Sequence, residues 1–457
     1  MSMFSEYLHL LIQNRNVSIA GLSRDSGVER TTIHKALTGS RILPYQAVEL
    51  LAYHLKLSPQ EGQKLRQYYN LLFEKEGIYR SRQIIDDTFM ELSDMKSGRD
   101  WLPAAEMAVS EQGEKEQNTF RGYSGIMTLL QSVFEEEMKQ ADPRVEIAAP
   151  VSTKVIGNSI LNLYFYRQAN IKISHIICFD TSTAIEEYNL RNLESFRYFL
   201  PACLFSGQQY HLYYYYNDAV NVRYVDPLPY YIVTHSGVIC LSENCQTAIY
   251  LREKEMIEYF RSCFYHTLSS CHELAEYVTD SEEVEQLYNE KVWDEGCYLV
   301  SGQPCMVKVC VQKGLQEKGK CYTFFPKIVV EKFMETGLLS DDSQLCDRTL
   351  KKEDRLSMLR KLIEAISEDR VTGRLLNDMT FIFPDYLSVL TSVNNGMMIC
   401  KIGPEGENGR SLGIRIVEPE LCRTVHHWLL HLPESEHTLD REKTVEILKG
   451  ILLEYSA

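Results

Sequence analysis

A stretch near the N-terminus, residues 17–41, carries side chains that could bind nucleic acid at the spacing of a helix. Four hydrogen-bonding side chains would share the outer face of that helix: Arg30, Thr31, His34 and Lys35. Three apolar side chains would face inward: Ile33, Ala36 and Leu37. The polar groups of the outer face can reach base edges or phosphates of a duplex. The pattern therefore predicts a helix that contacts double-stranded DNA, and a surface helical hairpin is the alternative.

A tight turn would hold this helix against a preceding one. Gly27 stands where the first helix would end, and glycine adopts the positive φ needed there without steric cost. Val28 can then tuck its apolar side chain under the pair. Ser18 would cap the N-terminus of the first helix, whose free amide groups can also bind a phosphate. The sequence therefore predicts two short helices joined by a turn.

Further short helices flank this pair. Apolar residues recur at helical spacing within residues 4–12 and again within 48–55. Ser58-Pro59-Gln60-Glu61 combines an N-cap, a proline at the first helical position and a capping-box glutamate. The centre of the segment reads Gly-Val-x-Arg-x-Thr-Ile-x-Lys over residues 27–35, with a later Gly-x-Arg. On these features, residues 3–76 resemble the Xre/phage-repressor family of helix-turn-helix DNA-binding domains.

That resemblance implies roles by position. It places the outer-face residues Arg30, Thr31, His34 and Lys35 in the major groove. It also implies phosphate contacts from residues at the helix shoulder, in the loop beyond and at the preceding cap: Thr32, Ser40, Arg41 and Ser18. Many members place a glutamine after the capping residue, where it buttresses the recognition side chains. Here the position is Ile19, so that glutamine is missing.

The charge of the 457-residue chain is unevenly spread. Its net charge is −15, yet residues 1–80 hold ten Lys and Arg against seven Asp and Glu, so the rest carries about −18. We expect a small basic head that touches DNA, and a homodimer that binds two half-sites to compensate for modest affinity per monomer. Residues 1–11 lack the pattern of a signal peptide, and no apolar run approaches the length of a membrane span. We therefore expect a cytoplasmic protein with no membrane partner.

The 13 cysteines are scattered, with no Cys-x-x-Cys motif, and are most simply reduced thiols. Two pairs are separated by four residues, Cys240/Cys245 and Cys305/Cys310, and a further cluster spans residues 263–272. Structural zinc usually shows tighter pairing, so zinc is the minor alternative, and we expect no cofactor. The sequence also lacks a phosphate-binding loop, a dinucleotide-binding glycine motif, a nucleophile elbow and His-Glu-x-x-His.

Beyond residue 120 the pattern changes to alternating helices and strands, which favours a mixed α/β body. Strands are expected at 145–150, 171–179 and 210–216, with a hairpin around Ser236-Gly237 and an exposed loop at 403–410. The predicted organisation is multidomain, an all-α helix-turn-helix domain and then a large α/β body. The boundaries are 1–77 for the DNA-binding domain, 78–119 for a helical connector, 120–280 for one lobe and 281–457 for a second.

The second half of the body repeats features of the first. Residues 248–257 align without a gap to 413–422, at an offset of 165, and in both a short strand ends in Glu-x-Glu and enters a helix. Two such lobes resemble the phospholipase D-like superfamily, whose catalytic members carry His-x-Lys-x4-Asp in each lobe. The body has no such motif, since Ser236-Gly237 follow His235, and His54-Leu-Lys56 lies in the head with Glu61 in place of aspartate. We therefore expect a non-catalytic body.

Tyrosines gather in the first lobe. Along a strand Tyr213 and Tyr215 would face one side and Tyr214 and Tyr216 the other, so one pair is expected in the core. The other pair could meet a ligand, although ordinary surface is the simpler interpretation.

The sequence thus predicts a transcriptional regulator whose body senses a small-molecule or peptide effector or holds a dimer together. An antitoxin or defence-system regulator whose body binds a partner protein is the second hypothesis. An enzyme controlled by DNA binding is the third.

Overall fold

The computed structural model describes residues 2–72, 76–96, 118–180, 190–217, 227–278, 296–304, 306–308, 311, 320–338, 349–392, 396–401 and 412–456. The chain forms two compact units, Met1–Ser81 and Arg82–Ala457. The domain boundaries expected from the sequence stay predictions. The expected loop at 403–410 and residues 97–117 of the expected connector lie outside the described residues.

The first unit is a group of short helices: α1 (Met3–Asn14), α2 (Ile19–Ser26), α3 (Arg30–Leu37), α4 (Tyr45–His54) and α5 (Pro59–Asn70). Local chemistry sets their ends. The Ser18 hydroxyl accepts from the Gly21 amide at 3.0 Å, and Gly27 ends α2 at φ 72°. Ser58 and Glu61 form the expected capping box. All five helices contribute to one apolar core.

Helix α6 (Glu76–Lys96) spans the boundary between the two units, with Arg82–Lys96 in the second. Its apolar side chains recur at helical spacing, and Ile85, Phe89 and Leu92 are fully buried in the core of the second unit.

The second unit begins with a mixed sheet. Its strands are β1 (Thr119–Arg121), β2 (Arg144–Ala148), β3 (Lys172–Asp180), β4 (Tyr210–Asn217), β5 (Tyr230–Val233), β6 (Val238–Leu241), β7 (Thr247–Leu251) and β8 (His272–Glu273). The order across the sheet is β1-β7-β6-β5-β2-β3-β4-β8, with β2, β3 and β4 parallel and the other pairs antiparallel. The helices are α7 (Gly122–Glu137), α8 (Lys154–Leu161), which continues as a π-helical turn over Asn162–Tyr166, α9 (Leu190–Phe205) and α10 (Lys254–Leu268).

A second mixed sheet follows. Its strands are β9 (Ala275–Val278), β10 (Gly296–Ser301), β11 (Lys320–Phe325), β12 (Thr372–Leu375), β13 (Leu387–Ser392), β14 (Gly396–Lys401) and β15 (Leu412–Ile416), in the order β12-β11-β10-β13-β14-β15-β9. The helices are α13 (Lys327–Thr336), α14 (Lys352–Ser367), α15 (Pro419–His431), a 3-10 turn over Leu432–Glu434 and α16 (Arg441–Ser456).

The two sheets share one topology. Leaving β8 aside, each sheet has an edge strand, then three parallel strands, a β-hairpin and one further strand, which pairs with that edge strand and leads into a helix. The strand register shows which residues correspond. In the first sheet Val233 pairs with Val238, which in turn pairs with Leu251. In the second sheet Thr391 pairs with Met397, which in turn pairs with Ile416. Leu251 and Ile416 lie at the offset of 165 that the sequence suggested. The predicted multidomain α/β organisation is confirmed, and the sheets agree with two similar lobes.

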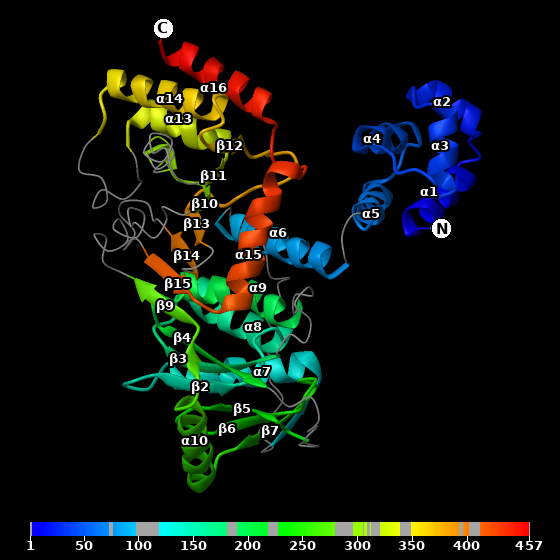
Figure 1. Cartoon of the computed structure of the whole chain (residues 1–457). Coiled ribbons are helices and arrows are strands. Elements are labelled where there is room, and N and C mark those ends of the chain that lie inside the picture. Colours follow the sequence, from blue (N-terminus) through cyan, green and yellow to red (C-terminus); the bar gives the residue numbers. More distant parts are fainter. Residues whose placement is uncertain are drawn as a thin grey trace. The chain divides into compact units, whose positions relative to one another are not determined.

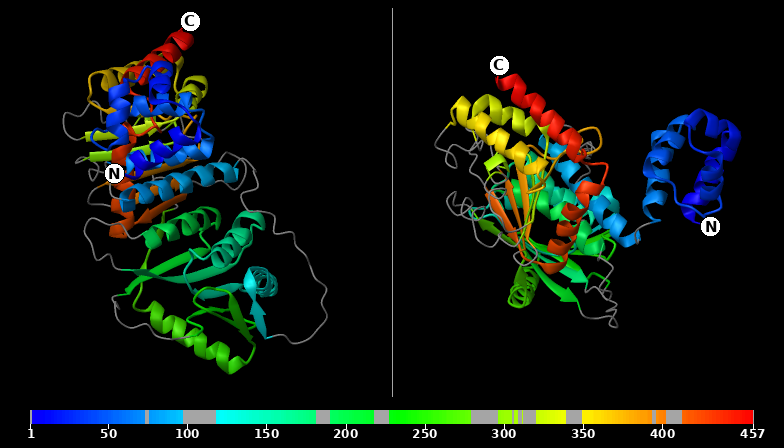
Figure 2. Two further views of the ribbon diagram at one scale, coloured as in Figure 1. Left: turned by 90° about the vertical axis from the view of Figure 1, so that its right-hand side faces the viewer. Right: turned by 45° about the horizontal axis from the view of Figure 1, so that its top comes forward.

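The lobes are stacked so that equivalent faces do not meet. Helix α10 covers β2, β5 and β6 on the outside of lobe 1, where Val233, Val238 and Ile257 form a small core of their own (Figures 1 and 2). The equivalent helix α15 covers β10, β13 and β14 but lies in a large core shared with α6 and α9. Helices α13, α14 and α16 cover the other face of the second sheet.

Candidate nucleic-acid interface

Helix α3 is fixed to its unit through one face. Ile33, Ala36 and Leu37 are buried, as the sequence predicted, and Val28 fills the space below the turn. The buried Ser5 hydroxyl of α1 donates to the Ala36 carbonyl at 2.7 Å, which ties the end of α3 to α1. The helix therefore presents its opposite face at a fixed angle to the unit.

The opposite face is polar and open. The side chains of Arg30, Thr31, His34 and Lys35 are all exposed within this unit. Among residues 2–72, the structure gives no hydrogen bond or ion pair to the side chains of Arg30, His34 and Lys35, so their donors remain available to a ligand. This arrangement suits direct contact with base edges.

The residues expected at phosphates have mixed surroundings. Thr32 is half-buried and its hydroxyl lies 3.4 Å from the Glu29 carboxylate, as does that of Thr31. The Ser40 hydroxyl donates to the Lys35 carbonyl at 3.1 Å, so it helps to close the end of α3. Arg41 is exposed beside it, and Ser18 caps α2. Contact of these residues with DNA stays a prediction.

Two ion pairs of this unit join residues outside α3. Arg15 pairs with Glu61 at 2.6 Å, and Arg66 makes two contacts with Glu49 at 2.7 and 2.9 Å. The Arg15 guanidinium and the Ser58 donors lower the pKa of Glu61 to about 2, and Arg66 lowers the pKa of Glu49. The Glu61 and Glu49 carboxylates are thus each paired with an arginine, and neither pair includes a residue of α3.

Two charged residues of this face were not assigned a role from the sequence. Glu29 is the N-cap residue of α3 and Arg24 is exposed in the last turn of α2. A carboxylate at this position can accept from a cytosine amino group but repels phosphate. Glu29 directly precedes Arg30, and Arg24 lies three residues before Gly27; these positions in the sequence were the available signal.

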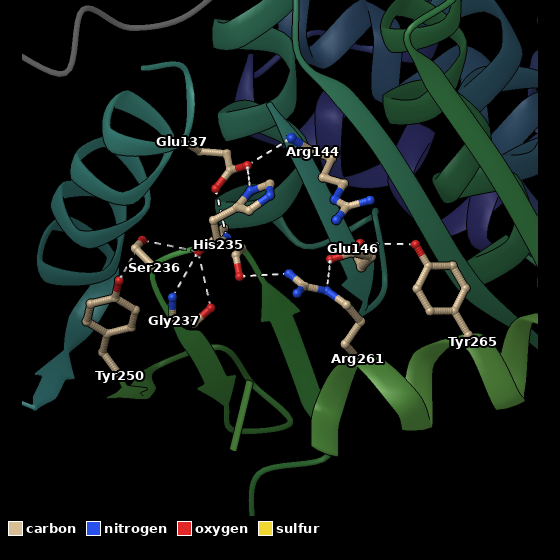
Figure 3. Close-up of polar contacts among 10 residues, drawn as sticks. Glu137, Arg144, Glu146, His235, Ser236, Gly237, Tyr250, Arg261 and Tyr265 are labelled. Carbon is tan, nitrogen blue, oxygen red and sulfur yellow. Dashed lines mark hydrogen bonds and ion pairs between the residues drawn. The ribbon is translucent and has the colours of Figure 1, made fainter. Parts of the chain in front are cut away.

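A second polar cluster lies in lobe 1, around the β5–β6 hairpin (Figure 3). Glu137, at the end of α7, is fully buried and accepts three hydrogen bonds, from the Arg144 amide at 2.8 Å, the His235 amide at 2.9 Å and His235 Nδ1 at 2.5 Å. One carboxylate thereby joins α7, β2 and the hairpin. His235, the histidine of the body that lacks a following His-x-Lys motif, is thus bonded to a buried glutamate.

The same cluster continues toward α10. Buried Glu146 of β2 lies 3.5 Å from Arg261 Nε and accepts from the Tyr265 hydroxyl at 3.2 Å. Burial raises the pKa of Glu146, while Arg261 opposes the increase. Arg261 also donates to the Thr234 carbonyl at 2.9 Å. In these contacts the polar groups of Glu146, Arg261 and Tyr265 bond one another or the Thr234 carbonyl, and they attach α10 to the sheet. We therefore interpret the cluster as structural.

The tyrosines of β4 alternate as expected. Tyr214 is buried and Tyr216 half-buried on one side, whereas Tyr215 is exposed and Tyr213 half-buried on the other. The Tyr216 hydroxyl donates to Glu418, the buried N-cap residue of α15, so Tyr216 joins the two lobes.

The part of the chain that the structure describes brings together no group of three His, Cys, Asp or Glu side chains able to hold a metal ion. Cys240 and Cys245 are buried free thiols, and Cys305 and Cys310 lie outside the described residues. None of the described helices has the length and hydropathy needed to cross a bilayer.

No family model matches the sequence, and no curated protein matches it. The chain also matches several solved structures at low sequence identity, among them the following two. TrmBL2, an archaeal chromatin protein described with a novel mode of DNA binding, is 11% identical over 59% of this chain and 100% of that one, at a TM-score of 0.23. Phosphatidylserine synthase of Haemophilus influenzae Rd KW20 is 10% identical over 74% of this chain and 92% of that one, at a TM-score of 0.25. At such TM-scores neither similarity carries an argument about this chain.

Proposed function

We propose that the chain is a sequence-specific DNA-binding protein that regulates transcription. The supporting observation is the exposed row of Arg30, Thr31, His34 and Lys35 on a helix whose other face is locked into a small core. An α-helix of this kind fits the major groove, and its arginine can bond guanine while its lysine bonds a base or phosphate.

The proposal extends to the form of the complex. One unit offers only two short helices to a duplex, so we propose that two copies bind half-sites related by twofold symmetry. The α/β body would hold the copies together or respond to a small-molecule or peptide effector. We propose no catalysis, since the sequence lacks His-x-Lys-x4-Asp in the body.

The test begins with duplexes selected by the full chain from a random pool. Arg30→Ala and Lys35→Ala should each weaken binding to the selected duplex by about tenfold or more, because each removes a cation from the groove. Lys64→Ala is the matched control, since Lys64 is also exposed but lies on α5 over the rings of Tyr7 and Tyr68. Footprints that Arg30→Ala and Lys35→Ala leave unchanged would contradict the role of α3.

A further inference from the structure

Lobe 1 brings two side chains that can carry positive charge together at the start of β2. The backbone amides of Arg144 and His235 donate to the two oxygens of one carboxylate, that of Glu137, at 2.8 and 2.9 Å. The strand register agrees, because β2 and β5 are antiparallel and Glu146 pairs with Val233, each two residues away. Arg144 and His235 are therefore neighbours across the sheet, beside the Glu137 carboxylate (Figure 3).

The His235 ring is fixed along one edge and open along the other. Its Nδ1 lies 2.5 Å from Glu137, which is fully buried. Within the described residues, neither Nε2 of His235 nor the Arg144 guanidinium has a hydrogen-bond or ion-pair partner. The His235 side chain is 31% exposed, and Arg144 is exposed. Both side chains can therefore bond a ligand that arrives from solvent.

A third cation extends this pair into a row. Arg144 pairs with Lys172 in the parallel register of β2 and β3, and paired residues point to the same face of a sheet. Lys172 is exposed, and in the described part of the chain no hydrogen bond or ion pair engages its side chain. Neighbouring strands lie about 4.8 Å apart, so the basic row of His235, Arg144 and Lys172 is about 10 Å long.

The carboxylates near the basic row leave its charge available. Glu137 lies behind the row and is engaged by its three hydrogen bonds, and buried Glu146 is held by Arg261. Asp142 is exposed, but it forms no ion pair with Arg144 in the described residues. The body as a whole is strongly acidic, so a row of unpaired cations runs against its composition. This contrast favours a ligand that is an anion.

We propose that the basic row binds a small molecule with two oxyanion groups, either phosphates or carboxylates. A guanidinium binds such a group through two parallel hydrogen bonds, so Arg144 would hold the first group together with His235 or Lys172. Because the row is about 10 Å long, a second group can reach the cation that the first one leaves free. The proposal concerns lobe 1 alone, so it goes beyond the proposed function and does not depend on DNA binding by the first unit.

Calorimetric titration of the full chain with pyrophosphate, succinate and inorganic phosphate tests the proposal. Salt is kept at about 0.15 M, where attraction to exposed charge alone is largely screened. We expect saturable binding of pyrophosphate, of succinate or of both, and the choice tells a phosphate site from a carboxylate site. Inorganic phosphate can meet only part of the row, so it should bind about fivefold more weakly than the better of the other two.

Three variants remove one contact each. Arg144→Gln should weaken binding by about tenfold, and Lys172→Gln and His235→Asn by about threefold each. Asparagine keeps a donor where Nδ1 meets Glu137 and removes only the open edge of the ring. Lys154→Gln is the matched control, because Lys154 is also exposed but begins α8, at the opposite end of β2. Circular dichroism confirms that each variant is folded.

The outcomes separate this proposal from the proposed function. Absence of saturable binding to all three anions would overturn the basic row as a site and leave DNA binding untouched. Unchanged affinity in Arg144→Gln, or an equal loss in Lys154→Gln, would overturn it as well. Arg144 and Lys172 are exposed, so their variants decide the matter even where His235→Asn does not fold.

Discussion

Helices α10 and α15 hold equivalent positions in the two lobes but different places in the molecule. Each follows the strand after the β-hairpin of its sheet, β7 or β15, and covers three equivalent strands. Helix α10 lies on the outside of lobe 1, with only Ile257 and Phe264 buried, whereas α15 is enclosed by α6 and α9 and buries seven side chains. Within the described residues, the stacking of the lobes thus turns one copy of the same helix into core and leaves the other as surface.

The equivalent contacts between strand and helix also differ between the lobes. The register makes Glu146 of β2 equivalent to Tyr298 of β10, and the offset makes Arg261 of α10 equivalent to His426 of α15. In lobe 1 the pair is ionic and partly open to water, with the Arg261 side chain 22% exposed. In lobe 2 the rings of Tyr298 and His426 meet edge to face at 4.3 Å. A buried ion pair is costly unless fully satisfied, so the enclosed copy favours rings over charges.

The largest expected effect on stability comes from truncating a buried side chain of α15, the enclosed helix. Trp428 fills the space between α15 and α6, and Trp428→Ala should lower the free energy of unfolding of the body by about 3–5 kcal/mol. The residue equivalent to Trp428 at the offset of 165 is Cys263, which is half-buried on α10. Cys263→Ala should cost less than about 1 kcal/mol. Urea unfolding followed by circular dichroism measures both, and equal losses would contradict the distinction between the two helices.

The two copies should also respond to pH in opposite directions. Burial, with His427 beside it, lowers the pKa of His426 to about 4 from 6.5. The unfolded chain therefore binds a proton before the folded one does, and stability present above pH 6.5 is lost as pH falls toward 4, by about 2–3 kcal/mol. Burial raises the pKa of Glu146, so its contribution to stability increases as pH falls through the folded-state pKa.

Two substitutions separate these effects. His426→Phe keeps a ring against Tyr298 and should reduce the loss of stability between pH 7 and pH 4.5. Glu146→Gln removes the opposing gain and should steepen that loss. Urea unfolding at each pH gives the slope of the unfolding free energy against pH. Identical slopes for the two variants would show that neither group titrates as its burial requires.

Much of the first unit could be predicted because its signals are local. Gly27 at a positive φ, Ser18 as a cap and the Ser58–Glu61 capping box each depend on neighbours within four residues. The open face of α3 follows from helical spacing alone. That this face binds DNA remains a prediction, since spacing gives exposure but not the partner.

The body could be predicted only in part. Alternation of strands and helices indicated an α/β fold, and the repeat at 165 residues located equivalent junctions. The stacking of the lobes could not be found, because α10 and α15 differ in burial through contacts with distant segments. Helix α6 shows the same limit. Its apolar stripe predicted a helix, but Asp86 meets Trp428 and His437 more than 340 positions away.

The smallest effect concerns the junction that the repeat first revealed. Glu253 and Glu418 are equivalent N-cap residues, one exposed and one fully buried. Glu418 accepts from the Leu421 amide at 2.7 Å, the Glu420 amide at 3.2 Å and the Tyr216 hydroxyl, whereas no side-chain bond from Glu253 caps α10.

Glu418→Ala should therefore lower the free energy of unfolding by about 1–3 kcal/mol, since buried donors lose their acceptor. Glu253→Ala should change it by less than about 0.5 kcal/mol. Tyr216→Phe in the Glu418→Ala background should restore part of the loss, because it removes a donor left without a partner. If the double variant is as unstable as Glu418→Ala alone, the decrease in unfolding free energy comes from the amides of α15 and not from the contact between the lobes.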